Sequence, residues 1–123
     1  MTLSDLDNME MYRGDQASWD VDVGADMTSA TVYFAVYATF QVGSIANDTT
    51  ALISKSTVSG ITITSATDGT FTVTVASADT AAWDFLGDTA NYVYGIEYKP
   101  SGETYRVSIG RGKFIVYKDV VRT

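Results

Sequence analysis

Residues 61–75 read ITITSATDGTFTVTV, and this stretch decides the fold class. Isoleucine alternates with threonine over residues 61–65, and phenylalanine or valine alternates with threonine over residues 70–75. Such alternation places apolar side chains on one face of a strand and polar side chains on the other. The pair Asp68-Gly69 between the two runs is a strong signal for a tight turn. The stretch therefore predicts a β-hairpin whose threonine face is half exposed.

The same period of two continues on both sides of this hairpin. It predicts further strands over Gln16–Val23, Thr31–Thr39, Ala51–Ser56 and Asn91–Lys99. A final strand begins at Tyr105, slips in phase at Gly110-Arg111-Gly112 as at a β-bulge, and resumes over Phe114–Tyr117. The good helix candidate is Ser77–Leu86, with Ser77 as its N-cap and Asp79 in its first turn. We expect it to make one or two turns that cross between sheets.

These elements predict an all-β protein, an immunoglobulin-like Greek-key β-sandwich of about seven strands with one short helical crossover. A closed small barrel is the alternative architecture. The 123 residues suit one domain. We place this domain at residues 16–123, after an N-terminal extension of residues 1–15 that becomes ordered on a partner subunit. Trp19 is in phase with Val21 and Val23 and is expected in the core.

The composition excludes most catalytic machinery. The chain has no cysteine and no histidine, so it has no disulfide, thiolate nucleophile, imidazole base or zinc finger. We therefore expect no enzyme, no cofactor and no metal. The apolar runs are strand-sized, and the N-terminus MTLSDLDNMEM is acidic where a signal peptide is basic. We expect a soluble protein without a cleaved export signal.

The charge is negative overall and unevenly placed along the chain. A formal net charge of −7 argues against binding to nucleic acid or to an anionic membrane. Residues 1–26 carry seven acids and one base, whereas residues 99–123 carry six bases and two acids. The opposite charges of these segments can pair within one molecule, which is the simpler expectation, or head to tail between copies. Assembly of the second kind should weaken with salt.

Four short motifs each have an ordinary structural explanation that we prefer. Arg13-Gly14-Asp15 matches an integrin-binding tripeptide, but a loop before a strand also favours glycine and aspartate. Asn47-Asp48-Thr49 matches the pattern of an N-glycosylation site, but we expect no export signal, and the motif is then an unmodified loop. Gly110-Arg111-Gly112-Lys113 lacks the spacing and the helix of a phosphate loop, and a bulge explains it better. Asp20 and Asp22, with Asp15 or Asp26, match a calcium site or a glycosidase pair, but a solvated strand face explains them more simply.

The eight tyrosines are the more informative residues. Tyr92, Tyr94 and Tyr98 share a face with Ile96, so part of that set is expected in the core. Tyr33 and Tyr37 lie on the face opposite Val32, Phe34 and Val36. If the latter three residues form the core, the two tyrosines are exposed or lie at an interface, where tyrosine is favoured. A carbohydrate-binding platform of exposed aromatic rings is the competing interpretation.

In its order of motifs the chain resembles the small immunoglobulin-like virion proteins of tailed bacteriophages and is similar to the N-terminal domain of their baseplate upper proteins. The matching segments are YRGD with Trp19, DMTSA leading into TVYFAV, ALISKS, GITIT with DGTFTV, SADTAAW, YVYGIEYKPSGETY and GKFIVYKDV. The resemblance implies a β-sandwich that docks on the phage particle and has no catalytic residues to transfer. The chain departs from the baseplate protein in having no coiled coil or C-terminal module after the sandwich. We therefore expect an accessory or decoration subunit.

The sequence thus favours a non-enzymatic virion structural protein, assembled in the bacterial host cytoplasm, whose partners are phage capsid or tail proteins. We expect a homo-oligomer or a lattice-bound subunit, in which symmetry multiplies weak contacts. The predicted contact surfaces are the acidic segment Met1–Asp15 and a set of aromatic and basic residues, namely Tyr33, Tyr37, Arg106, Arg111, Lys113 and Lys118. The alternative function is a glycan- or host-surface-binding adhesion module that uses Tyr33, Tyr37 or the Arg13-Gly14-Asp15 loop.

Overall fold

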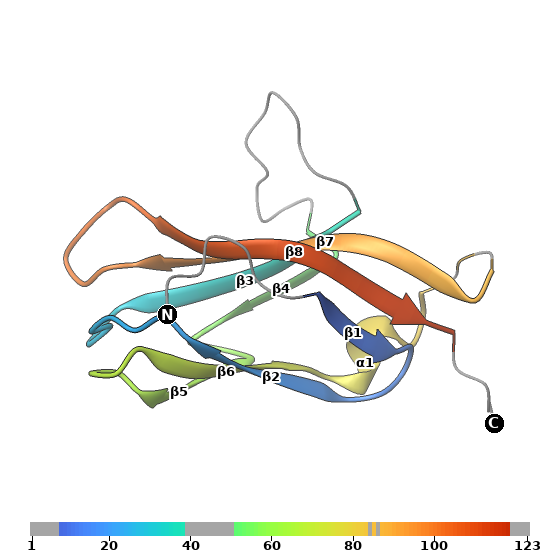
Figure 1. Ribbon diagram of the computed structural model, residues 1–123, viewed down its shortest axis with the longest axis horizontal. Coiled ribbons are helices and arrows are strands. Elements are labelled where there is room, and N and C mark those ends of the chain that lie inside the picture. The colour runs from blue at the N-terminus through green and yellow to red at the C-terminus, as the bar shows by residue number, and fades with distance from the viewer. Residues whose placement is uncertain (1–7, 39–50, 84, 86, 119–123) are drawn as a thin grey trace.

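The computed structural model describes residues 8–38, 51–83, 85 and 87–118, which form two β-sheets packed face to face (Figure 1). The elements in chain order are β1 (Met9–Tyr12), β2 (Ala17–Asp22), β3 (Thr31–Tyr37), β4 (Ile53–Ser56), β5 (Ile61–Ser65), β6 (Thr70–Val75), α1 (Ser77–Thr80), β7 (Thr89–Lys99) and β8 (Val107–Tyr117). One sheet has five strands in the order β1-β8-β7-β3-β4, and the other has three in the order β2-β6-β5. The prediction of an all-β sandwich is confirmed.

The core lies between the two sheets and is built by the alternation read from the sequence. Val32, Phe34 and Val36 of β3 are at most 1% exposed, whereas the residues between Thr31 and Tyr37 that alternate with them point to the outside of the sheet. The facing layer contributes the apolar residues of β6, which have the same alternation. Burying each such side chain stabilises the fold by about 1.5–3 kcal/mol. Trp19 is partly buried and packs edge-on against Phe114 of β8, with ring centroids 5.8 Å apart.

The predicted hairpin is confirmed with the bounds read from the sequence. β5 and β6 pair antiparallel, and the register shifts between Ile63 and Ser65. Gly69 closes the turn at a φ of +77°, a backbone conformation that side chains disfavour. A Cβ at this position would also overlap the carbonyl oxygen of Ala25 in the neighbouring loop. Glycine is therefore required here by both the backbone angle and the close approach of the two loops.

The bulge predicted in the last strand is also present. β7 and β8 pair antiparallel, with Ile96 opposite Gly110 and Glu97 opposite Ser108. Ile109 is thus the extra residue, one position before the glycine that we predicted to begin the slip. Both Ile109 and Gly110 are buried. The bulge changes the phase of β8, so that Ile109 on one side and Phe114 on the other both face the core.

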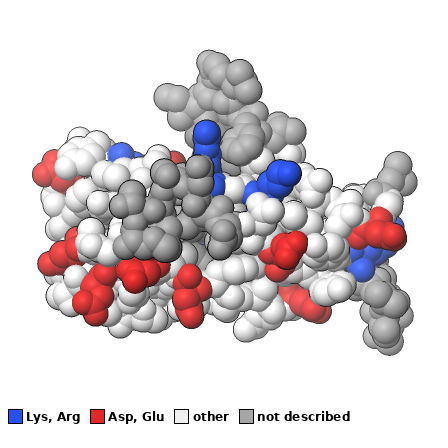
Figure 2. All heavy atoms as spheres, viewed as in Figure 1, with Lys and Arg blue, Asp and Glu red and all other residues white. Residues whose placement is uncertain are grey.

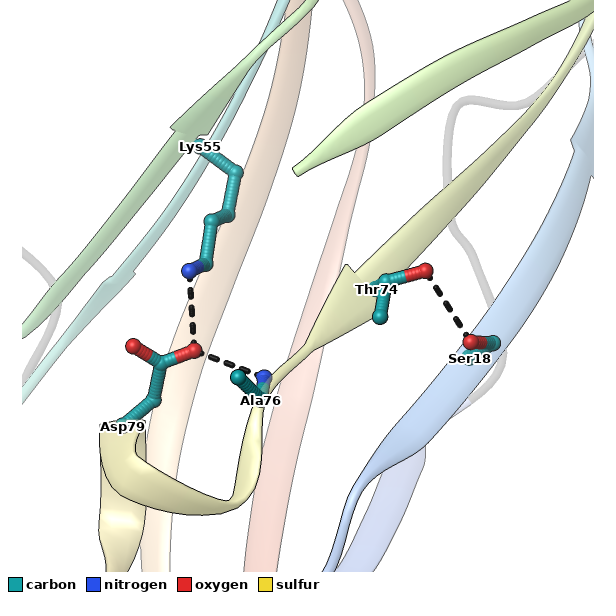
Figure 3. Close-up of polar contacts among 5 residues, drawn as sticks. All are labelled: Ser18, Lys55, Thr74, Ala76 and Asp79. Carbon is teal, nitrogen blue, oxygen red and sulfur yellow. Dashed lines mark hydrogen bonds and ion pairs between the residues drawn. The ribbon is translucent and has the colours of Figure 1, made fainter. Parts of the chain in front are cut away.

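The predicted helix is present as a single turn that crosses from β6 of one sheet to β7 of the other, within the one or two turns expected, but it covers only the first part of the candidate range Ser77–Leu86. It ends at Thr80 instead of continuing toward residue 86, and Ala76, not Ser77, is its N-cap. The carboxylate of Asp79 accepts the Ala76 backbone N–H at 2.8 Å and pairs with Lys55 of β4 at 2.8 Å (Figure 3). Beyond the helix, the Trp83 ring packs on Tyr92 with centroids 4.7 Å apart. This packing takes the chain away from a helical path after one turn. In the part of the chain that the structure describes, no helix is long and apolar enough to cross a membrane.

The predicted domain boundary is wrong for residues 9–12. These residues form β1, which pairs parallel with β8 at the edge of the five-stranded sheet. Met9 and Met11 are 4% and 5% exposed and belong to the core. The acidity of Met1–Asp15 favours an extension, whereas the alternation of Met9 and Met11 with Glu10 and Tyr12 is too short to predict a strand by itself. The domain therefore begins no later than Met9, before the boundary predicted at residue 16.

Candidate functional site

The outer faces of the two sheets differ in chemistry. The outer three-stranded face is covered by hydroxyls and carboxylates, namely Ser18, Asp20, Asp22, Thr62, Thr64, Thr70, Thr72 and Thr74. Its side chains bond to one another, since the Thr72 hydroxyl donates to Asp20 at 2.8 Å. The hydroxyls of Ser18 and Thr74 are also hydrogen-bonded, at 3.0 Å (Figure 3). The outer five-stranded face instead includes Tyr12, Tyr33, Tyr37, Val93, Arg111, Lys113, Ile115 and Tyr117. Aromatic residues and arginine are enriched at protein interfaces, so the second face is the candidate contact surface.

The charges are separated across the thickness of the sandwich. The strands of the smaller sheet carry Asp20 and Asp22 and no lysine or arginine. The strands of the larger sheet carry four bases, Lys55, Lys99, Arg111 and Lys113, against Glu10 and Glu97. In Figure 2 the blue spheres near the centre lie over the upper layer, and most red spheres lie below them. The sequence predicted charge separation between chain ends, and the fold converts it into separation between layers.

The strand register brings four of the predicted contact residues together. Paired residues of neighbouring strands share a face. Three rows cross the outer five-stranded face from β8 through β7 to β3, and they are Lys113–Val93–Tyr37, Arg111–Gly95–Ala35 and Ser108–Glu97–Tyr33. In the middle row Gly95 and Ala35 have little or no side chain, and a Cβ built on Gly95 would meet no atom within 4 Å. The two tyrosines of β3 therefore flank a row of low side chains that ends at Arg111.

Arg106 joins this group from the loop before β8. Its guanidinium carbon lies 4.0 Å from the centroid of the Tyr33 ring, which is a close cation–π contact. Arg106 is itself exposed, so the pair presents a cation on top of an aromatic ring. One face of Tyr33 is thus covered and does not offer an open platform for a sugar ring.

Lys118, the sixth predicted contact residue, lies elsewhere. It follows β8 directly, and its backbone N–H donates to the carbonyl oxygen of Asp88 at 2.8 Å. Its ammonium group lies 5.6 Å from the centroid of the Phe85 ring. Arg13 lies over the same ring at 5.6 Å. Lys118 therefore belongs to the end of the sandwich where β1 turns into β2, away from Arg106 and Tyr33.

The sequence reasoning missed a tyrosine pair on the same outer face. Tyr12 of β1 and Tyr117 of β8 are register partners with ring centroids 5.4 Å apart, and Tyr12 is 52% exposed. The Tyr117 hydroxyl donates to the Glu10 carboxylate at 2.6 Å. This hydrogen bond is the main reason why the pKa of Tyr117 is raised above its usual value. No local signal in the sequence joins these residues, because parallel pairing of the first and last strands is a property of the whole fold.

The Arg13-Gly14-Asp15 tripeptide is unavailable for recognition, because its arginine is only 4% exposed. Arg13 donates to the Trp83 carbonyl oxygen at 2.9 Å, and the Gly14 backbone N–H donates to the buried hydroxyl of Thr80 at 2.9 Å. The tripeptide therefore holds the turn between β1 and β2 against the end of α1 and the segment that follows it. This finding removes the loop from the adhesion hypothesis.

The other motifs have structural roles where the structure describes them. Gly110-Arg111-Gly112-Lys113 lies within β8. Asp26 accepts both the backbone N–H and the hydroxyl of Thr28, and these hydrogen bonds lower the pKa of its carboxyl. Within the described ranges no three acidic side chains gather where a metal ion would bind. The motif Asn47-Asp48-Thr49 and residues 1–7 of the acidic segment Met1–Asp15 lie outside the described residues.

Comparison with protein-family models and with curated proteins gives no match for the chain. The assignment of the candidate surface therefore depends on the geometry and chemistry of its side chains.

Proposed function

We propose that the protein is a non-enzymatic structural subunit of a tailed bacteriophage virion that docks on the particle through its outer five-stranded face. The observation that carries the proposal is the contrast between the two outer faces. One concentrates tyrosines with Arg106, Arg111 and Lys113, while the other is made of threonine, serine and aspartate. Tyrosine and arginine bring large contact area and directional hydrogen bonds to a protein interface.

The sandwich is further proposed to be an immunoglobulin-like Greek key. If β2 to β8 are taken as strands B, C, C′, D, E, F and G of that fold, the sheet orders become B-E-D and G-F-C-C′. The parallel pairing of β1 with β8 adds a first strand to the G edge. This order supports the resemblance to immunoglobulin-like virion proteins. It also places all the proposed contact residues except Lys118 on the outside of one sheet or in the loop beside it.

The partner is expected to be an acidic surface of a capsid or tail protein, because Arg111 and Lys113 lie near the middle of the docking face. Each contact needs only modest affinity, since a symmetric particle presents many copies of the same binding site. The subunit would then act as a head decoration or as a tail or baseplate accessory. The virion, assembled in the host cytoplasm, is the proposed location.

Cosedimentation tests this proposal directly. Heads and tails are purified separately from a tailed phage whose genome encodes the chain, and saturable binding to one of them is expected. Val93→Glu places a carboxylate between Lys113 and Tyr37 and should abolish binding. The matched control Thr62→Glu adds the same charge to the outer three-stranded face and should leave binding intact. Absence of binding to either fraction, or equal loss for both variants, would overturn the proposed docking face.

One observation favours the alternative of a glycan-binding adhesion module. The exposed Tyr12 ring, the neighbouring Tyr117 ring and the Glu10 carboxylate combine aromatic surface with a hydrogen-bond acceptor, which is a combination suited to sugars. This module would bind a polysaccharide as an isolated domain and lose binding on Tyr12→Ala. Binding that persists in Tyr12→Ala, or a protein that binds phage particles and no polysaccharide, would reject the alternative.

A further inference from the structure

We propose that the outer five-stranded face of one copy binds the outer three-stranded face of a second copy, so that the sandwiches stack in one direction. This inference rests on the proposed function, because it names a second copy as a partner of the same docking face. The argument begins with charge complementarity. The outer three-stranded face carries Asp20 and Asp22 and no base. The outer five-stranded face carries three bases, Lys99, Arg111 and Lys113, against two acids, Glu10 and Glu97, so its charge remains positive.

Hydrogen-bonding chemistry also matches between the two faces. Hydroxyls of Thr62, Thr64, Thr72 and Thr74 cover the acidic face. Those of Thr64 and Thr72 donate within the face, to Thr70 and Asp20, and a hydroxyl oxygen has two lone pairs with which to accept from a partner. The opposing face offers tyrosine hydroxyls, a guanidinium and an ammonium group. Acidic carboxylates facing arginine and lysine form the shorter and stronger charge-assisted hydrogen bonds. The two surfaces thus pair donors with acceptors over both charged and uncharged positions.

The position of the two faces determines the form of the assembly. They lie on opposite sides of one sandwich, in the upper and lower layers of Figure 1. A contact between unlike faces is heterologous, and it closes only if the rotation between copies makes a ring. Each bound copy therefore still offers a free acidic or basic face to the next copy. The expected products are columns or rings, not a closed two-fold dimer.

The net charge of −7 per copy sets an unusual salt dependence. Sheets that stack are about 10 Å apart, so the centres of two stacked sandwiches lie roughly 20 Å apart. The Debye length is about 30 Å at 0.01 M salt and about 8 Å at 0.15 M, so overall repulsion acts between copies only at the lower ionic strength. Charge pairs in contact are much closer and lose strength chiefly near 1 M salt, where the Debye length is about 3 Å. Association should therefore be strongest near 0.15 M and weaker at both extremes.

Sedimentation velocity with a charge exchange tests the stacking. The wild-type mass should rise above 13.3 kDa with concentration and pass beyond the dimer at intermediate salt. The double variant Arg111→Glu, Lys113→Glu has two acidic faces, and the double variant Asp20→Lys, Asp22→Lys has two basic faces. Each alone should associate about tenfold more weakly or worse, since like charges then meet across the contact. An equimolar mixture of the two variants restores opposite charges at every contact and should regain assembly.

A charge-matched control separates this contact from a simple change of net charge. The double variant Asp88→Lys, Glu103→Lys raises the net charge from −7 to −3, as does the Asp20→Lys, Asp22→Lys pair, but it changes residues outside both faces. It should keep full association. Circular dichroism confirms folding of each variant, and the mixture provides a readout that a misfolded variant cannot restore.

Three outcomes would overturn the stacking. They are a monomer at every salt concentration, a closed dimer, and a mixture that fails to regain assembly although both variants are folded. The proposed function is tested separately, by cosedimentation at protein concentrations below self-association. A monomeric protein that still binds phage particles would reject stacking alone, whereas self-association without binding to particles would reject the proposed function alone.

Discussion

Arg13→Met is expected to destabilise the fold by about 2–4 kcal/mol, although it removes a buried charge. Arg13 is 4% exposed, and its guanidinium donates to the Trp83 carbonyl oxygen at 2.9 Å and lies 5.6 Å from the Phe85 ring centroid. A hydrogen bond from a charged donor contributes about 1.5–3 kcal/mol. The cation–π contact adds roughly 0.5–2 kcal/mol when partly desolvated. Methionine keeps most of the volume and loses both contacts.

Desolvation acts in the opposite direction. Burying the charge of Arg13 costs the wild type free energy, and Arg13→Met removes this cost. Replacing buried ionic groups with apolar residues of similar volume is often neutral or stabilising. Two features make the loss of the contacts larger than the gain from relieved desolvation. Arginine is more weakly hydrated than lysine, so its burial costs less. The Trp83 carbonyl oxygen also loses a charged donor that methionine cannot replace, and an unpaired acceptor costs about 1–3 kcal/mol.

Urea unfolding measures the difference. With a slope near 1–3 kcal/mol per molar urea, the midpoint for Arg13→Met should fall by roughly 1–2 M with the slope unchanged. The matched control Lys113→Met replaces an exposed cation of β8 and should stay within about 0.5 kcal/mol of wild type. A stability of Arg13→Met equal to that of the control would refute the reasoning, because desolvation would then balance the contacts. A gain in stability would show that desolvation dominates.

Three further predictions concern turns and side-chain pairs. Gly69→Ala should lose at least about 2 kcal/mol in urea unfolding, because the side chain meets both a left-handed backbone angle and a carbonyl oxygen; a loss below 1 kcal/mol would contradict this overlap. Glu10→Gln should lower the raised pKa of Tyr117 toward its usual value near 10 in a tyrosine absorbance titration, and an unchanged curve would reject Glu10 as the cause. The sign follows from the direction of the shift: the stabilising effect of this hydrogen bond is fully present below the usual tyrosine pKa and is lost as the pH rises through the higher pKa of the folded state. Asp79→Ala should lower the free energy of unfolding by about 1–3 kcal/mol. Lys55→Met should then cost less in the Asp79→Ala background than in the wild type, because its ion-pair partner is already absent. Additive losses would show that the 2.8 Å ion pair contributes nothing.

Strand identity could be predicted from the sequence because it depends on local periodicity. β5 and β6 have the predicted bounds, and β3 begins at the predicted Thr31. Each of these strands has one face in the core, so its apolar and polar side chains must alternate. The bulge in β8 left a similar local trace, since a glycine-rich slip in phase marks an extra residue.

The elements that were mispredicted depend on contacts between distant residues. β1 consists of four residues, and its partner lies more than 100 residues away along the chain. Its apolar residues, Met9 and Met11, also have weak strand propensity. α1 has a sequence that favours a longer helix, but the Trp83–Tyr92 packing and the hydrogen bond from Arg13 fix the chain after one turn. In both cases tertiary packing overrides the local pattern.

The candidate surface depends on sheet order, which periodicity does not specify. Alternation shows that Tyr33 and Arg111 each point away from a core, but it does not show that one sheet carries both. The register through β7 supplies that information, because Gly95 pairs with Arg111 on one side and with Ala35 on the other. A barrel built from the same strands would have distributed its outward charges around a closed surface. The sandwich instead collects the acids of β2 on one outer face and the bases of β8 on the opposite one, and this opposition is what makes stacking in a single direction a testable consequence of the fold.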